Sequence, residues 1–411
     1  MTEPSSAGSV PLEPRRGSLS EVAQLFLKLG CIAFGGPAAH VAMMRQEVVQ
    51  RRRWLSDQRF LDLFGACNLI PGPSSTELAI MLGYERAGWL ALVLAGVLFI
   101  APAMLIVLVI AWAYVHFGTL PAAGWLLYGI KPVIIAIVLQ ALYGLWRTAV
   151  TKGTLLAGVA VLVFALYLLG LNVILLLFGL GILYMLMRNG RRLVHSRASP
   201  IVSGGGLGLL ARIAMPAAAG KAAVTLPGLT LTFLKLGVVV YGSGYVLLAF
   251  LRAGFVTHLH WLSDQQLVDA VAVGQFTPGP VFTTATFLGY LFAGLPGALL
   301  ATVAIFLPSF VLVALIYPWI ARLRQSVRLS AFLDAANAAA LGLMAAVTLE
   351  LARASLMAPS GFTRAPPFGF DPWAVSIFLI AAVILLRFRP NSAWLVLGGA
   401  AAGAGLKLAG L

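Results

Sequence analysis

Residues 54–73 read WLSDQRFLDLFGACNLIPGP, and residues 261–280 read WLSDQQLVDAVAVGQFTPGP. The two stretches lie 207 residues apart, and they share WLSDQ at their start and Pro-Gly-Pro at their end. The same shift relates FLKLG at 26–30 to FLKLG at 233–237. Several identical segments in one register do not arise by chance, so the chain contains an internal duplication.

The composition indicates that most of the chain lies in lipid. Of the 411 residues 61% are hydrophobic and 10% charged, with a mean hydropathy of +0.97, whereas soluble domains carry roughly 25% charged residues. Long apolar runs recur along the chain, over residues 87–114, 125–145, 155–187, 298–320, 335–349 and 374–386. Most reach or approach the ~20 residues with which a helix crosses a bilayer core. The predicted fold class is therefore an all-α polytopic membrane protein.

Each copy of the duplicated unit is predicted to follow one plan. A glycine-rich break comes first, and a polar turn follows in which Ser56 and Ser263 are candidate helix N-caps. The next helix is broken by Pro-Gly-Pro, and four longer apolar spans complete the unit, which gives about ten transmembrane helices plus two broken or re-entrant segments. The predicted boundaries are a polar tail over 1–20, a first repeat over 21–190, a linker over 191–230 and a second repeat over 231–411.

The distribution of basic residues indicates how the two repeats are oriented. Lys and Arg collect in cytoplasmic loops, and the first repeat concentrates them at 45–59, at Arg147 and Lys152, and at 188–197, but has none at 116–123. In the second repeat the segment at 322–328, which matches that uncharged loop, is the basic one. The repeats are therefore predicted to face opposite ways, as inverted-topology repeats do.

The two breaks suggest an anion-binding site. A helix interrupted inside a membrane exposes free N–H groups and the positive end of its dipole, which favour an anion. Basic residues matched at the 207-residue shift would add charge, since an ionisable residue at membrane depth is a functional candidate by default. The candidate substrate-binding residues are Lys28, Gly35, Gly36, Arg45, Asn68, Pro71, Gly72, Pro73, Ser74, Ser75, Thr76, Lys235, Gly242, Ser243, Gly244, Arg252, Gln275, Pro278, Gly279, Pro280, Thr283 and Thr284. The alternative is that Pro and Gly only kink helices, while the basic residues snorkel or set the orientation.

Three acidic residues in the broken units are candidates for proton coupling: Glu77, Asp62 and Asp269. Asp62 and Asp269 match each other, whereas the counterpart of Glu77 is Thr284, so Glu77 is the asymmetric acid beside the proposed site. The alternative is a carboxylate satisfied by an arginine or by free N–H groups. Three other expectations concern single roles: Asp57 and Asp264 act as first-turn acids, His40 is structural, and Arg51, Arg52 and Arg53 serve orientation.

Several classes of function are disfavoured by the sequence. The net charge is +15, but no soluble basic face is available to bind nucleic acid. Cys31 and Cys67 are the only cysteines and form no CxxC pair, which disfavours a thiol redox site, a soft-metal site and a disulfide scaffold. No nucleotide-binding P-loop and no metalloprotease motif occurs, and residues 1–20 carry no apolar core of a signal peptide. We therefore expect no catalytic residues, no metal and no cofactor.

Four segments resemble the chromate ion transporter (CHR) family in its long-chain, two-domain form. They are FGGPAAHVAMMRQEVV (34–49), RRRWLSDQRFLDLFGACNLIPGP (51–73), ELAIMLGYERAG (77–88) and VDAVAVGQFTPGP (268–280). The resemblance extends over nearly the whole chain, and it is looser at 241–244, where YGSG stands in place of FGGP. It implies export of chromate, or of its analogue sulfate, from the cytoplasm through the bacterial inner membrane.

The sequence thus predicts a secondary transporter that moves a small tetrahedral oxyanion, most simply chromate, out of the cell. Moving one charge along the membrane potential is worth about 2.3 kcal/mol per 100 mV, so efflux of a dianion is favoured. The alternatives are an exporter of another anion such as an organic carboxylate, and an integral membrane enzyme acting on lipid phosphate. The expected partners are the oxyanion and the lipid bilayer, with no nucleic acid and with homodimerisation left open.

Overall fold

The computed structural model describes residues 17–67, 69–118, 120–193, 224–241, 246–320, 327–357, 369–388 and 390–409. Within these ranges the chain is built from helices, and the one β-type pairing is an isolated bridge between Met357 and Phe370. The predicted all-α class is therefore confirmed. The tail before residue 17 and most of the predicted linker lie outside the described residues.

The first half of the chain, residues 17–193, begins with two short helices that are separated at Phe34-Gly35. Ser56 caps the third helix as predicted, since its hydroxyl accepts the Arg59 N–H at 3.2 Å. The elements are α1 (Leu19–Ile32), α2 (Gly36–Arg45), the π-helix η1 (Gln46–Arg51), α3 (Asp57–Cys67), α4 (Ser74–Ala87), α5 (Trp89–Phe117), α6 (Pro121–Lys152), α7 (Thr154–Leu168), the π-helix η2 (Leu175–Gly179) and α8 (Leu180–Leu193).

The second half, residues 224–409, starts inside the predicted linker. Thr225 caps the first helix and Pro227 lies in its first turn, so the helix begins at Leu226 rather than after residue 230. Ser263 and Gln266 form the predicted capping box. The elements are α10 (Leu226–Val239), α11 (Leu247–Leu251), the π-helix η4 (Arg252–His258), α12 (Asp264–Phe276), the 3-10 turn η5 (Val281–Thr283), α13 (Thr284–Ile316), the 3-10 turn η6 (Tyr317–Trp319), α15 (Val327–Leu356), α16 (Pro372–Phe388) and α17 (Ser392–Leu408).

Local backbone conformations recur at the duplicated positions. The π-helices η1 and η4 overlap at the shift of 207 residues. Arg53 and His260, also 207 residues apart, both have positive φ angles, of 50° and 51°. Gly88, which separates α4 from α5, has φ 78°, and Gly294, which breaks α13, has φ 61°. Identical backbone deviations at matched positions indicate that the two stretches follow the same path locally.

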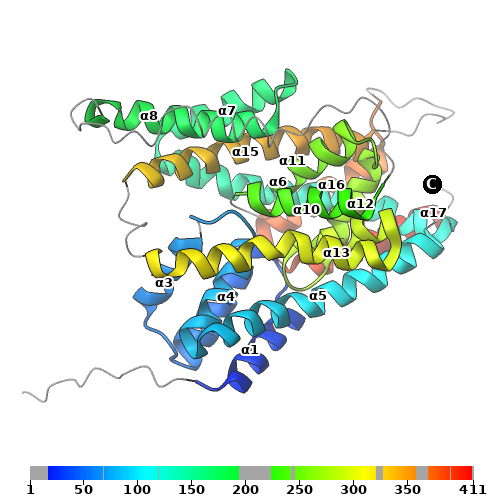
Figure 1. The fold of residues 1–411 in the computed structure, drawn as a ribbon. Helices are drawn as coiled ribbons and strands as arrows, with labels where there is room; N and C mark the ends of the chain where they lie inside the picture. The colour runs from blue at the N-terminus through cyan, green and yellow to red at the C-terminus, as the bar shows by residue number, and fades with distance from the viewer. Residues whose placement is uncertain are drawn as a thin grey trace, which may run out of the picture.

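Helix α13 crosses the middle of the view in Figure 1, between α10 and α5. It packs against α10 of its own half and against α4 and α5 of the first half. Helix α5 also packs on α1 and α4, while α15 packs on α6, α7 and α8. The side chains of Val313 and Ile320 are buried among first-half residues, so the two halves share a hydrophobic core.

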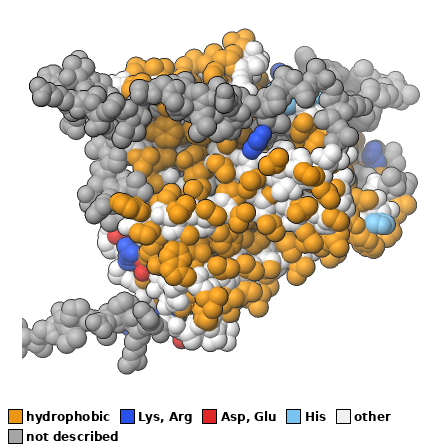
Figure 2. Space-filling view, in the orientation of Figure 1, with side chains coloured by type: hydrophobic (Ala, Val, Ile, Leu, Met, Phe, Trp, Pro, Cys, Tyr) orange, Lys and Arg blue, Asp and Glu red, His pale blue; other side chains and the backbone are white. Residues whose placement is uncertain are grey.

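The outer surface of the described residues is apolar. Figure 2 shows hydrophobic side chains over most of the visible face, with few charged groups among them. Within the described ranges, four helices are long and apolar enough to cross a membrane: Trp89–Phe117, Ala123–Thr151, Val281–Trp319 and Leu329–Leu356. Shorter apolar helices accompany them. An exposed apolar surface of this extent suits lipid and would be unfavourable in water; the total of ten crossings remains a prediction.

Candidate functional site

Both Pro-Gly-Pro triplets are non-helical, as predicted, and both are buried. The first separates α3 from α4, and the second separates α12 from η5. Gly72 has φ +139° and Gly279 has φ +88°, conformations that favour glycine. Because proline has no N–H, the glycine N–H is the one backbone donor in each triplet.

The two glycine N–H groups form a crossed pair of hydrogen bonds between the halves. Gly72 N–H donates to the Val240 carbonyl at 2.8 Å, and Gly279 N–H donates to the Ala33 carbonyl at 2.8 Å. Ala33 and Val240 follow α1 and α10 and are themselves 207 residues apart. Each break is therefore attached to the end of the first helix of the other half.

The break at Gly72 lies against a buried carboxyl group. Glu77 in α4 is fully buried, with Oε1 at 3.4 Å from the Ser309 hydroxyl of α13. Its Oε2 and the Thr76 hydroxyl have no hydrogen-bond partner among the described residues. A side chain at position 72 would place its Cβ 2.4 Å from Glu77 Oε1 and from Ser309 Oγ. The absence of a side chain at Gly72 thus leaves room for this carboxyl group and hydroxyl.

Most of the other predicted hydroxyl donors are occupied within the protein. The Ser75 hydroxyl lies 3.3 Å from His40 Nδ1, and His40 Nε2 donates to the Ala33 carbonyl at 3.0 Å, a structural role for His40 as predicted. Thr283 and Thr284 donate to backbone carbonyls of their own turn at 2.8 Å. The protons of these hydroxyl groups already have acceptors within the protein. The hydroxyl groups can therefore accept a hydrogen bond but have no proton left to donate to an anion.

Four of the remaining predicted site residues can be placed. Gly35, with φ +102°, caps α2, and Gly36 is the first residue of that helix. Ser74 starts α4. Gln275 is buried in the last turn of α12, and its amide Nε2 has no hydrogen-bond partner among the described residues. Four others, Asn68, Gly242, Ser243 and Gly244, lie outside the described residues.

Two of the matched arginines form matched ion pairs. Arg45 binds Asp57 with two contacts, of 2.6 and 2.8 Å, and Arg252 binds Asp264 with two contacts, of 2.8 and 3.3 Å. Both pairs join the helix before the polar turn to the helix after it. Arg252 Nη1 also lies 2.6 Å from Glu350 Oε2. The two aspartates, expected to be first-turn acids, are thus also guanidinium partners.

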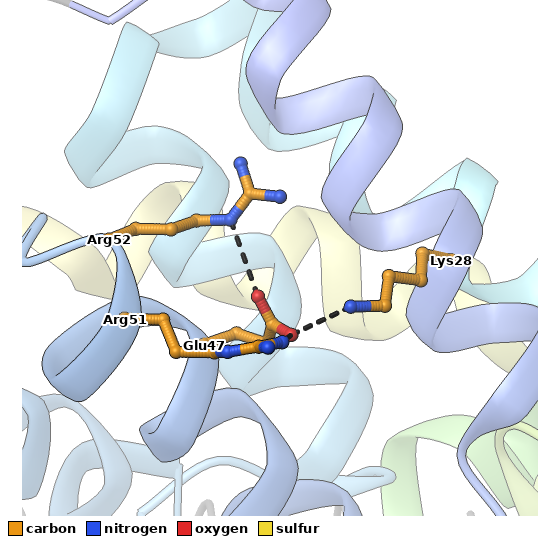
Figure 3. A network of polar contacts seen from close by, with 4 residues as sticks. All are labelled: Lys28, Glu47, Arg51 and Arg52. Atoms are coloured by element: carbon orange, nitrogen blue, oxygen red, sulfur yellow. Dashed lines mark hydrogen bonds and ion pairs between the residues drawn. The ribbon is translucent and has the colours of Figure 1, made fainter.

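Lys28 belongs to a cluster of three cations around one carboxylate (Figure 3). Its ammonium lies 2.8 Å from Glu47, which also binds Arg51 at 2.9 Å and Arg52 at 3.4 Å. The hydrogen bond from Lys28, together with those from the two arginines, lowers the pKa of Glu47 to about 2. Glu47 is therefore ionised at every physiological pH, and Arg51 and Arg52 have a structural contact besides the orientation predicted for them.

Lys235, the counterpart of Lys28, differs from the other three matched cations. No described residue provides it with a carboxylate, and position 254, which corresponds to Glu47, is a glycine. The side chain lines a cavity beside α10.

The matched acids Asp62 and Asp269 have different surroundings. Asp62 is half-buried and accepts from Gln58 Nε2 at 3.3 Å. Asp269 is buried, with the Lys131 ammonium 3.2 Å from Oδ1, an ion pair without hydrogen-bond geometry, and the Tyr114 hydroxyl donating to Oδ2 at 2.9 Å. Sequence reasoning missed Lys131, although a lone cation inside an apolar helix is itself a signal.

Comparison with known proteins gives consistent results. The family model described as Chromate transporter matches residues 20–185 and 228–404. A chromate transport protein of Cupriavidus metallidurans is 33% identical over 96% of this chain and 94% of its own length. A probable chromate transport protein of Synechococcus elongatus is 33% identical over 82% and 86%, and a chromate transport protein of Pseudomonas aeruginosa is 32% identical over 80% of each chain. No solved structure matches the chain.

Proposed function

Because the chain belongs to the chromate transporter family, we propose that this multi-pass membrane protein exports chromate from the bacterial cytoplasm across the inner membrane. The names of the relatives support chromate as the substrate, and sulfate is its chemical analogue. A dianion that leaves a compartment with a negative potential gains about 2.3 kcal/mol per charge for each 100 mV. Outward transport therefore needs no additional driving force, whereas concentrative uptake would need co-transported cations.

The crossed hydrogen bonds at Gly72 and Gly279 are the observation that carries the proposed mechanism. They bring a non-helical, buried segment of each half against the other half, where transporters with inverted repeats hold their substrate. We infer that the two halves are such repeats and that they rock against one another about these contacts. Substrate would bind beside the breaks, where Thr76 and Gln275 have polar atoms that no described residue pairs with.

The matched cations are proposed to attract the dianion, and their removal tests this. We expect Lys28→Gln, Arg45→Gln, Lys235→Gln and Arg252→Gln each to weaken chromate transport roughly ten- to a hundred-fold, the equivalent of a charge-assisted hydrogen bond of about 1.5–3 kcal/mol. The measurement is chromate flux into inverted vesicles at matched expression, with sulfate and an organic carboxylate as competitors. Competition by the carboxylate alone would favour the alternative anion exporter.

Two further variants separate attraction of substrate from structural pairing. Arg147 is an exposed cation of α6, and Arg147→Gln should transport like the unmodified protein. Asp57→Asn removes the partner of Arg45; if Arg45 attracts the anion, this variant keeps its flux while Arg45→Gln loses it. Equal losses in both would mean that the ion pair is structural. Wild-type flux in all four cation variants would leave backbone and hydroxyl groups to bind the anion.

We also propose that Glu77 exchanges a proton during transport. The carboxyl group is fully buried, its partner is the neutral Ser309 hydroxyl, and Oε2 has no partner among the described residues. An ionised carboxylate at such a position costs several kcal/mol unless a cation pairs with it. A conformational change that exposes the group to water would remove this cost and so link the protonation state to the transport cycle.

The test of proton exchange uses Glu77→Gln, which preserves size and polarity but cannot be deprotonated. In liposomes whose membrane potential is clamped, a pH gradient should change chromate flux through the unmodified protein but not through this variant. Glu21→Gln, which alters a carboxylate paired with Arg86 at 2.7 Å, should respond like the unmodified protein. A full response in Glu77→Gln would assign coupling, if any, to another group.

A further inference from the structure

A small cavity lies between α10, η4 and the turn that precedes η2. Its volume is about 60 Å³, and its polar lining comes from Asn172, Thr232, Lys235 and His258, with apolar side chains around them. A cavity needs about 10–15 Å³ to hold one water molecule, so the space suffices for a compact tetrahedral group. None of the lining residues belongs to a Pro-Gly-Pro triplet.

The polar groups of this cavity are matched to an anion. The Asn172 side-chain oxygen already accepts from the Ile174 N–H at 2.9 Å, which leaves its NH₂ group to donate. The Thr232 hydroxyl already donates its proton to the Gly228 carbonyl at 2.8 Å, so the donors left for an anion come from the other polar residues. Lys235 supplies an ammonium group and His258 an imidazole, and none of the described residues that line the cavity is acidic. An ammonium and an amide NH₂ can only donate, so the lining lacks a negative partner.

In the first half of the chain, the matched lysine has an acidic partner. There, Lys28 is 2.8 Å from the carboxylate of Glu47. In the second half the lysine is retained as Lys235, whereas the glutamate is replaced by Gly254, which lines the cavity. A Cβ added at Gly254 would meet nothing within 4 Å. The cavity thus occupies the side of the lysine where the first half has a carboxylate.

We propose that this cavity, the Lys235 pocket, binds a phosphate- or sulfate-type oxyanion group. The bound group takes the role that the Glu47 carboxylate has beside Lys28. It is either a free oxyanion or the headgroup phosphate of an anionic lipid, since the two share the same chemistry. The pocket shares Lys235 with the proposed function but contains no residue of either Pro-Gly-Pro triplet, so its binding of sulfate or lipid is measured separately from chromate flux.

The test measures binding to the purified full-length protein in a neutral detergent. Equilibrium dialysis with radiolabelled sulfate detects the free oxyanion, and native mass spectrometry after addition of phosphatidylglycerol or phosphatidylcholine detects the lipid. Lys235→Gln should weaken binding about tenfold or more, as loss of a charge-assisted hydrogen bond does. Lys235→Arg should retain it. If the unmodified protein binds sulfate but not phosphatidylglycerol, the ligand is a free anion. If it binds phosphatidylglycerol but not sulfate, the ligand is a lipid.

The decisive variant is Gly254→Glu, which restores the carboxylate of the first half. It should fill the pocket, pair with Lys235 and exclude both ligands, while the protein still folds. Gly405→Glu adds the same charge at an exposed glycine whose Cβ would also meet nothing within 4 Å; this variant should bind normally, as should Arg147→Gln. Binding by Gly254→Glu equal to that of Gly405→Glu would overturn the proposal, even if Lys235→Gln failed to fold.

Discussion

Alanine in place of Gly72 or Gly279 should reduce chromate transport to the background of empty vesicles. Both glycines have positive φ angles, which cost an alanine about 1–2 kcal/mol. The new Cβ would lie 2.4 Å from Ser309 Oγ of the second half in the first case and 2.9 Å from Ala103 Cβ of the first half in the second, and overpacking of this kind adds about 1–3 kcal/mol. Relief of the clash separates the break from the other half and lengthens its hydrogen bond. The measurement is flux per amount of folded protein.

Two other glycines provide matched controls for this prediction. Gly170 has φ +87°, close to that of Gly279, and Gly153 has φ +149°, close to that of Gly72. A Cβ at either control would meet nothing within 4 Å, so Gly170→Ala and Gly153→Ala have the backbone strain without the clash. They should retain most of the transport activity. Similar activity in all four variants would mean that close contact between the halves at the breaks is not required.

The second large effect is expected from the pair formed by Lys131 and Asp269. Lys131→Met would leave the Asp269 carboxylate, whose side chain is 5% exposed, with the Tyr114 hydroxyl as its remaining described partner. An uncompensated buried charge costs about 3–5 kcal/mol, a large share of the ~5–15 kcal/mol that stabilises a typical domain. We expect a marked loss of folded protein, measured as thermal stability in detergent.

A double-mutant cycle shows whether the two residues act as a pair. Asp269→Asn alone should also destabilise the protein, because Lys131 then loses its ion-pair partner. The double variant Lys131→Met with Asp269→Asn should lose less stability than the two single variants lose together, since neither charge remains. Additive losses would show that the 3.2 Å contact contributes no coupling. Arg147→Met should have little effect.

The sequence was informative wherever the controlling interaction is local. Pro-Gly-Pro interrupts a helix through the missing proline N–H, and a serine cap needs an N–H only three residues away. The caps at Ser56 and Ser263 and both breaks follow from this chemistry. The start of α10 could have been found in the same way, since Thr225 and Pro227 are an ordinary start signal.

The partners of the charged residues could not be predicted, because they depend on packing between distant segments. Asp269 and Lys131 are far apart in the sequence, and α6 lies beside α12 only in the folded chain. Even the repeated pair of Arg45 and Asp57 depends on how the polar turn folds back. The crossed bonds at the two breaks join residues with no sequence signal, since any residue has a carbonyl group. Orientation in the bilayer and the substrate-binding role of the candidate residues remain predictions.

The exchange of backbone contacts between the halves has a consequence for the gene. A polypeptide that contained one half alone would lack the carbonyl acceptor for its own break, so it would have to assemble with a second half-length chain. Joining both halves in one reading frame fixes their ratio and makes their encounter intramolecular. It also allows the halves to diverge: Glu77 is matched by Thr284, and the Lys28–Glu47 contact by Lys235 and Gly254. A symmetric dimer of identical chains would carry each of these groups twice, whereas the fused chain can have one copy of each.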